Sequence, residues 1–158
     1  VPRLAWPAIA ERRRGVEAAL RKVDGAELTV VACGEEYGAT QAALAAYLGK
    51  HEVPHAILGG NDQMGIAAMR LLASRGMRVP QDVLVSGFNA FQFRSYTDPM
   101  LTSVISSAYD MGARAGAELL HRLTTGVFAH AEIVLPTSFA PGGSTSAEGV
   151  PAPGLPGR

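Results

Sequence analysis

The sequence predicts an α/β fold in which a parallel sheet carries helices on both faces. Short apolar and β-branched runs near residues 28–33, 56–59, 83–87 and 102–105 alternate with longer stretches in which apolar residues recur at helical spacing. The clearest unit is an apolar run, a polar turn, a helical stretch and a second apolar run. Two strands joined through one helix are normally parallel, and ligands bind such sheets at the carboxyl ends of the strands.

The composition fits a folded, soluble chain. With 158 residues, of which 47% are hydrophobic, the chain is long enough to bury a core, and no run of about 18 apolar residues could span a membrane. Fourteen basic and fourteen acidic residues cancel, so the chain lacks the positive charge that DNA phosphates select. Cys33 is the single cysteine, which excludes an intrachain disulfide and suits a reducing compartment. We therefore expect a cytoplasmic protein that enters no membrane and does not itself bind DNA.

The N-terminal part is predicted to be a helix followed by a strand. Between residues 8 and 23, Ile9 and Leu20 belong to an apolar stripe opposite a charged face. Residues 28–33 are apolar and β-branched, which predicts a buried strand. Tyr37 then falls in the loop at the carboxyl end of this strand.

The next stretch, residues 40–50, has the apolar spacing of a helix. His51 and His55 follow at the i, i+4 spacing of a zinc pair, but Pro54 between them breaks the helix that would place them on one face. The sequence therefore predicts no metal site here.

A strand, a helix and a second strand are predicted over the central part of the chain. Residues 56–58 form the first strand, and Asn61 follows it at the start of a helix that ends near Gly76. Residues 83–85 begin the second strand, and Asn89 lies just past its end. Asn61 and Asn89 should therefore meet at one edge of the sheet.

Beyond this unit the pattern predicts a strand at residues 102–105 and a long helix at residues 108–123. The apolar residues expected to face inward on that helix are Met111, Ala115, Leu119, Leu120 and Leu123. Residues 133–135 form the last clear predicted strand, and residues 137–139 add a short one. Residues 147–158 consist mainly of Pro, Gly and Ala without apolar periodicity, which predicts a disordered tail.

Four segments together resemble one family of regulators. They read AILGGNDQM at residues 56–64, RGMRVPQDV at 75–83, SGFN at 86–89 and DPMLTSV at 98–104. In this order and spacing, within a similarity that extends over about residues 12–145, they resemble the effector-binding domain of the LacI/GalR transcriptional regulators. The resemblance implies an incomplete lobe of the type I periplasmic-binding-protein-like fold.

The resemblance also implies how the chain is divided between the two lobes of such a sensor. Residues 1–104 would form the second lobe without its first strands, and residues 135–146 its closing strand. Residues 105–134 would be a returning segment of the first lobe. Nothing in the sequence resembles the helix-turn-helix of the family, so DNA would be bound through a domain absent from this chain.

Four residues are expected to bind the effector. The family carries an arginine three residues before a glycine in its corresponding helix, and Arg12 with Gly15 fits that spacing. In the family, an aromatic residue, usually Phe or Trp, stacks on the effector from the loop that corresponds to the one holding Tyr37. From the sequence alone, Tyr37 is equally well explained as a half-exposed loop residue. Asn61 and Asn89 offer amides at adjacent strand ends.

Two departures from the family bear on the effector. Asn89 stands where most members have an aspartate, and residues 141–145 read PGGST where an arginine commonly precedes the final Ser-Thr. An asparagine carries no charge, so Arg12 has no obvious counter-charge, and an unpaired charge in a pocket is costly. The effector is therefore expected to be a sugar or a sugar-derived acid or phosphate. Alternatively, Asn89 reshapes the pocket and Arg12 pairs with an acid of the first lobe.

The leading hypothesis is a sensor without enzymatic activity, cofactor or metal, which controls DNA binding by a helix-turn-helix. A solute-binding protein of a sugar transporter with the same fold is the first alternative. An α/β enzyme that uses Asp62 or Asp82 as acid or base is a remote alternative, because the two residues are better explained as a helix-start residue and a turn acid.

A homodimer is also expected. Members of the family dimerise partly through this lobe, and a lobe without its partner leaves apolar surface open to a second copy. The candidate contact residues are Met69, Leu72 and the aromatic run at residues 91–96.

Overall fold

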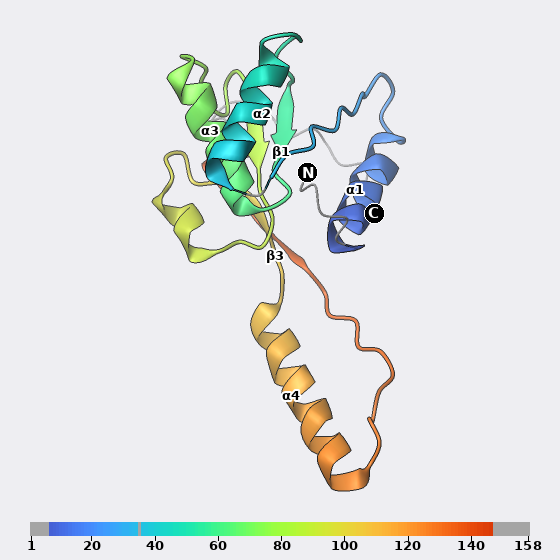
Figure 1. Cartoon of the computed structure of the whole chain (residues 1–158). Coiled ribbons are helices and arrows are strands. Elements are labelled where there is room, and N and C mark those ends of the chain that lie inside the picture. The colour runs from blue at the N-terminus through green and yellow to red at the C-terminus, as the bar shows by residue number, and fades with distance from the viewer. Residues whose placement is uncertain (1–6, 35, 147–158) are drawn as a thin grey trace.

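The computed structural model of the chain describes residues 7–34 and 36–146. Its helices are α1 (Pro7–Leu20), α2 (Tyr37–Leu48), α3 (Asp62–Ser74) and α4 (Ala108–Thr125), with short 3-10 helices η1 (Gln92–Tyr96) and η2 (Gly143–Thr145). Its strands are β1 (Ala56–Leu58), β2 (Leu84–Ser86), β3 (Ser103–Ile105) and β4 (Ser138–Ala140). Figure 1 shows a main body that contains α2, α3 and the strands, with α1 beside it and α4 projecting away. The tail predicted for residues 147–158 lies outside the described residues.

The central strand, helix, strand unit is confirmed. β1 and β2 pair in parallel, with Ala56 opposite Leu84 and Leu58 opposite Ser86. The α3 helix that connects them begins directly after Asn61, whose side chain accepts a hydrogen bond from the helix backbone. Because both strands run in the same direction, their carboxyl ends lie at the same edge of the sheet.

The sheet continues from β2 to β3 through two parallel bridges, Ser86 to Thr102 and Asn89 to Ile105. β3 then pairs with β4 in the antiparallel direction, with Ser103 opposite Ala140. The predicted parallel arrangement therefore holds from β1 to β3, and β4 closes the row as an antiparallel strand.

The core lies between the α2–α3 pair and the strands. Its members are Leu44, Ala68, Met69, Leu72, Val83, Val85 and Leu101. In Figure 1, α2 and α3 lie to one side of β1 and α1 lies to the other. No residue of α1 is buried, so α1 is held at the edge of the body by its polar contacts rather than by a core face.

The predicted strand at residues 28–33 is wrong. Residues 26–32 are outside any strand, and Cys33 forms only a single bridge. Cys33 is buried as expected, but Leu28 is 41% exposed. β-branched residues favour strands because they pack on a half-buried pleated surface, and residues 26–29 are all exposed.

Two predictions for the C-terminal part are also wrong. Residues 133–135 do not form a strand, and Val134 is 83% exposed, whereas the short strand expected at residues 137–139 is present as β4. The apolar stripe of α4, expected to face inward, is exposed along its whole length, and no residue of this helix is buried. Both segments lie away from the main body in Figure 1, where no described element covers them. Within the described residues, no helix has the length and hydropathy required to cross a membrane.

Candidate functional site

The site is built at the carboxyl ends of β1 and β2, where Asn61 starts α3. The Oδ1 atom of Asn61 accepts a hydrogen bond from the Met64 backbone nitrogen at 2.9 Å, which caps the helix. This bond identifies Oδ1 as the acceptor and leaves the Nδ2 group of Asn61 without a hydrogen-bond partner among the described residues. Asn61 therefore presents a donor at the sheet edge.

Arg12 reaches the same edge from α1. One guanidinium nitrogen donates to the carbonyl oxygen of Gly60 at 2.8 Å, and the other lies 3.4 Å from Oδ1 of Asn89. The guanidinium carbon lies 3.7 Å from the centre of the Phe88 ring, which is a cation–π distance. Arg12 thus connects the ends of both strands, and the structure brings it together with Asn89.

The charge of Arg12 meets neutral partners. The ion pairs within residues 7–34 and 36–146 are Arg13 with Glu17, Arg14 with Glu11, Arg78 with Asp82 and His130 with Glu118, so Arg12 belongs to none of them. Partial burial lowers the pKa of Arg12 because it removes water from the charged form. An arginine nevertheless remains charged at neutral pH. A positive charge therefore lies at this edge next to a carbonyl, an amide and an aromatic ring.

Asn89 occupies an uncommon backbone conformation. Its φ angle is 100° and that of Ala90 is 53°, so two consecutive residues with side chains lie at positive φ. The backbone nitrogen of Asn89 donates to the carbonyl oxygen of Val104 at 2.9 Å, which fixes the segment against β3. Since Oδ1 of Asn89 faces the donor on Arg12, its Nδ2 group is a second donor available at the edge.

Tyr37 does not join these residues. It is the first residue of α2 rather than a loop residue, and its hydroxyl accepts a hydrogen bond from Gln41 Nε2 at 3.1 Å. With Gln63, Ile66 and Phe93 it lines a separate shallow hollow of about 270 Å³, which the other three predicted site residues do not line. The helix begins three residues earlier than the apolar spacing predicts, and this moves Tyr37 onto α2.

Three residues at the edge were not expected from the sequence to contribute. The Gly60 carbonyl and the Phe88 ring contact Arg12, but a backbone oxygen and an apolar side chain leave no chemical pattern in a sequence. Asp62 was expected to start the helix, and it is also 0% exposed and accepts hydrogen bonds from Phe91 N and Ser103 Oγ. The sequence signal for Asp62 was its position next to Asn61, shortly after the apolar run of residues 56–58.

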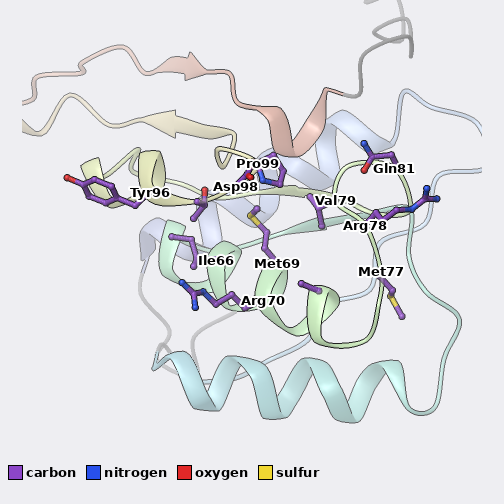
Figure 2. A pocket seen from close by; sticks show the side chains of 12 residues that line it. Ile66, Met69, Arg70, Met77, Arg78, Val79, Gln81, Tyr96, Asp98 and Pro99 are labelled. Carbon is purple, nitrogen blue, oxygen red and sulfur yellow. The ribbon is translucent and has the colours of Figure 1, made fainter.

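A second hollow, larger than the one that Tyr37 lines, lies on the outer face of α3. It has a volume of about 460 Å³, and Figure 2 shows Ile66, Met69 and Arg70 on one side with Tyr96, Asp98 and Pro99 on another. Its other lining residues are Ala73, Met77, Arg78, Val79, Gln81 and Thr97. This hollow contains none of the predicted effector residues, so size alone does not locate the candidate site.

Comparison with known proteins identifies the fold family. The family described as periplasmic binding protein-like domain matches residues 5–145. The regulator MalR of Streptomyces coelicolor, named as an HTH-type transcriptional regulator, is 34% identical over 118 residues, which are 75% of this chain and 33% of that protein.

Two solved structures agree with this result. A complex of the transcriptional regulator CelR with cellobiose has a TM-score of 0.77 at 29% identity and covers 85% of this chain and 42% of its own. A LacI family regulator from Arthrobacter sp. FB24 in complex with lactose has a TM-score of 0.76 at 25% identity and covers 85% and 50%. The chain thus spans about a third of the curated relative and half or less of the solved chains. It belongs to the periplasmic binding protein-like domain family, in the form found in LacI family transcriptional regulators.

Proposed function

We propose that this chain is part of the effector-sensing domain of a cytoplasmic transcriptional regulator, and that it has no enzymatic activity. Residues 1–104 and 135–146 would contribute to one lobe and residues 105–134 to the other, with DNA bound by a helix-turn-helix domain outside the chain. The convergence of Arg12 with Asn89 and the Gly60 carbonyl at the strand ends carries this proposal. Ligands bind folds of this type at that edge.

The effector is a sugar or a sugar derivative. Relatives of this chain are described in complex with cellobiose and with lactose, and such ligands present hydroxyl groups that side-chain amides and guanidinium groups bind well. Arg12 has a planar fork of donors, and Asn61 and Asn89 supply amides beside it. We propose no direct contact between Tyr37 and the charged group of the effector, because Tyr37 lines the separate hollow with Phe93. Its proposed role is limited to lining the wall of the effector pocket.

Within this class we favour an effector that carries a carboxylate or a phosphate. Among the described residues at the edge, the donors that remain for a ligand are the Nδ2 groups of Asn61 and Asn89 and those N–H groups of Arg12 that its bonds to Gly60 and Asn89 do not use. Arg12 forms no ion pair with the carboxylates of the described residues. An anionic group fits a site with surplus donors and one positive charge, since hydrogen bonds between charged partners are stronger than neutral ones.

The test compares a neutral sugar with its acid. The full-length protein is titrated by calorimetry with cellobiose and with cellobionate, in which the reducing-end glucose is oxidised to an open-chain carboxylate. We expect Arg12→Ala to weaken cellobionate about tenfold or more, the loss of one charge-assisted contact. Asn89→Asp should weaken cellobionate more than cellobiose, because the new carboxylate pairs with Arg12 and repels the ligand.

Arg13→Ala is the matched control, because Arg13 lies on the same helix and pairs with Glu17. Its affinities should equal those of the wild type. If Arg12→Ala leaves both affinities unchanged, the site assignment is wrong. If Asn89→Asp weakens the two ligands equally, the anion proposal is wrong and the sugar proposal remains.

A solute-binding role and an enzymatic role receive less support. The curated relative is a regulator rather than a transport component. The two carboxylates considered for acid or base catalysis are occupied: Asp62 is buried with two donors, and Asp82 is paired with Arg78. A general base needs a reactant within hydrogen-bond reach, and the carboxylate of Asp62, although it lies at the edge, is 0% exposed.

We also propose that the regulator is a homodimer that uses the outer face of α3. Ile66 and Tyr96 line the hollow on this face that Figure 2 shows, and Tyr96 is 78% exposed. Leu72, expected as a contact residue, is instead 0% exposed and belongs to the core, and Met69 is 6% exposed. Sedimentation at tens of micromolar, an order typical of weak interfaces, should show a dimer that Tyr96→Asp dissociates. A wild-type monomer would contradict this proposal.

A further inference from the structure

The turn that carries Asn89 is held by a buried polar network. Positive φ angles at Asn89 and Ala90 bring each Cβ close to its own backbone, so this turn persists only where surrounding groups fix it. Asp62 and Ser103 are the groups that fix it, and both are 0% exposed. They come from different elements, the first turn of α3 and the start of β3.

Asp62 binds the turn on both sides of Asn89. Its backbone nitrogen donates to the Phe88 carbonyl oxygen at 3.0 Å, and its Oδ2 atom accepts from the Phe91 nitrogen at 2.6 Å. Phe88 and Phe91, on either side of Asn89, are therefore both hydrogen-bonded to Asp62. A carboxylate is suited to this position because both of its oxygens accept hydrogen bonds.

Ser103 completes the network from β3. Its hydroxyl donates to Oδ1 of Asp62 at 2.5 Å and accepts from the Ala90 backbone nitrogen at 3.0 Å. The backbone nitrogen of Asn89 donates to Val104 of β3, and that of Phe91 donates to Asp62. The Ser103 hydroxyl accepts from the nitrogen between these two, that of Ala90. The glycine at position 87 leaves space for the Asp62 carboxylate, because a Cβ at Gly87 would lie 2.5 Å from Oδ1 of Asp62.

We propose that Asp62 and Ser103 are positioning residues for effector recognition. Through the turn they set the place of the Asn89 amide, with Oδ1 toward Arg12 and Nδ2 toward the edge where the ligand binds. Neither residue touches the effector, because both are fully buried. The part of this inference that concerns the effector rests on the proposed function, and the part that concerns the turn does not.

The competing explanation is that the two residues stabilise the core and nothing more. Ser144 provides the matched control, since it is also 0% exposed and its hydroxyl also makes two hydrogen bonds. It donates to the Val85 carbonyl oxygen at 2.6 Å and accepts from the Thr102 nitrogen at 2.8 Å. These bonds join η2 to the strands and do not involve the turn. Ser103→Ala and Ser144→Ala therefore remove the same chemical group at the same burial.

The experiment uses the full-length protein with both variants and two readouts. The first is amide hydrogen exchange at residues 89–91 of the ligand-free protein, monitored by NMR. The second is the affinity for cellobiose and cellobionate. Ser103→Ala should accelerate exchange at Ala90 and Phe91 about tenfold relative to Ser144→Ala and weaken the sugars about tenfold, as expected for the loss of a buried hydrogen bond. Ser144→Ala should leave the local exchange and both affinities near those of the wild type.

Two results would overturn the inference. One is that Ser103→Ala leaves exchange at Ala90 and Phe91 unchanged. The other is that both variants change the affinities equally, which indicates general destabilisation. If the wild type binds neither sugar, the proposed effector class has failed, and the exchange at residues 89–91 still decides whether Ser103 holds the turn.

Discussion

Helices α3 and α4 are both amphipathic, but they have different surroundings. Of the 13 residues of α3, seven are buried: Asp62, Met64, Gly65, Ala67, Ala68, Met69 and Leu72. The 18 residues of α4 include none that is buried, and its leucines are 55% to 74% exposed. Figure 1 shows the reason, since α3 lies against α2 and the strands while α4 projects from the body.

This difference shows that an apolar stripe predicts a helix more reliably than it predicts what the helix packs against. The i, i+3, i+4 spacing is a local property, and both helices form where that spacing occurs. Burial depends on other segments, and for α3 these are α2, β1 and β2. The four predictions below apply matched changes to the two regions, in order of decreasing expected effect.

The largest difference is expected from shortening one leucine in each helix. Leu72→Ala removes a side chain that is 0% exposed and should lower the free energy of unfolding by about 2–5 kcal/mol, because a cavity remains. Leu120 is 63% exposed, and Leu120→Ala should change the free energy by less than about 0.5 kcal/mol. Urea unfolding of the 158-residue chain, monitored by circular dichroism, measures both. Equal losses would mean that a partner covers α4 in solution.

The second difference comes from adding one methyl group to a glycine. At Gly87 a Cβ would lie 2.5 Å from Asp62 Oδ1 and 2.9 Å from Leu101 Cδ2, so Gly87→Ala should cost about 1–3 kcal/mol. At Gly116, within α4, a Cβ would meet no described atom within 4 Å apart from its chain neighbours and the helix's own backbone, and Gly116→Ala should stabilise the helix by about 0.5–1 kcal/mol. Thermal unfolding should therefore move in opposite directions. A stabilising Gly87→Ala would contradict the packing of the turn.

These contrasts explain which parts of the fold the sequence predicted. The unit from β1 to β2 was predicted because every signal in it is local: the apolar runs, Asn61 at the helix start and Gly76 at the helix end. Residues 28–33 and 133–135 have equally good strand propensity, yet neither forms a strand. Propensity describes a side chain that fits a covered surface, and the neighbour that would cover it is not visible in the segment itself.

The candidate site was predicted in part for a similar reason. Arg12 and Asn89 were expected together from a family pattern, and they contact each other across 77 positions of sequence. Tyr37 was misplaced because a shift of three residues at a helix start changes which element holds it. Ser103 was not singled out, because a serine in a strand gives no sign that its hydroxyl will meet a buried carboxylate.

The third difference concerns the first turn of each helix. Asn61 caps α3 through its side chain, and Asn61→Ala should lower the free energy of unfolding by about 1 kcal/mol. Ser107 precedes α4 without a side-chain cap bond, so Ser107→Ala should cost no more than about 0.5 kcal/mol. Asn61→Asp retains the acceptor and should stay near wild type. Ligand-free urea unfolding provides the measurement, and equal costs at the two positions would contradict the cap.

The smallest difference concerns two carboxylates, one in each region. In the main body the Arg78 side chain and backbone nitrogen donate to Asp82, and these bonds lower the pKa of Asp82 from 3.8 to about 2. Near the end of α4 the His130 ring donates to Glu118, which lowers the pKa of that carboxyl below 4.5. A depressed carboxyl pKa contributes stability above the unfolded value, and that contribution is lost as the pH falls through the folded value.

Carbon-detected NMR titration of the two carboxyl groups tests this directly. The Asp82 midpoint should lie near pH 2 and rise toward 3.8 in Arg78→Ala. The Glu118 midpoint should lie below 4.5 and rise toward that value in His130→Ala. Each variant should leave the other midpoint unchanged, because charges far apart across water are screened within about 10 Å at 0.1 M salt. A Glu118 midpoint at 4.5 in the wild type would show that the contact beside α4 is open in solution. The intact Asp82 pair would then mark the main body as the more rigid of the two regions.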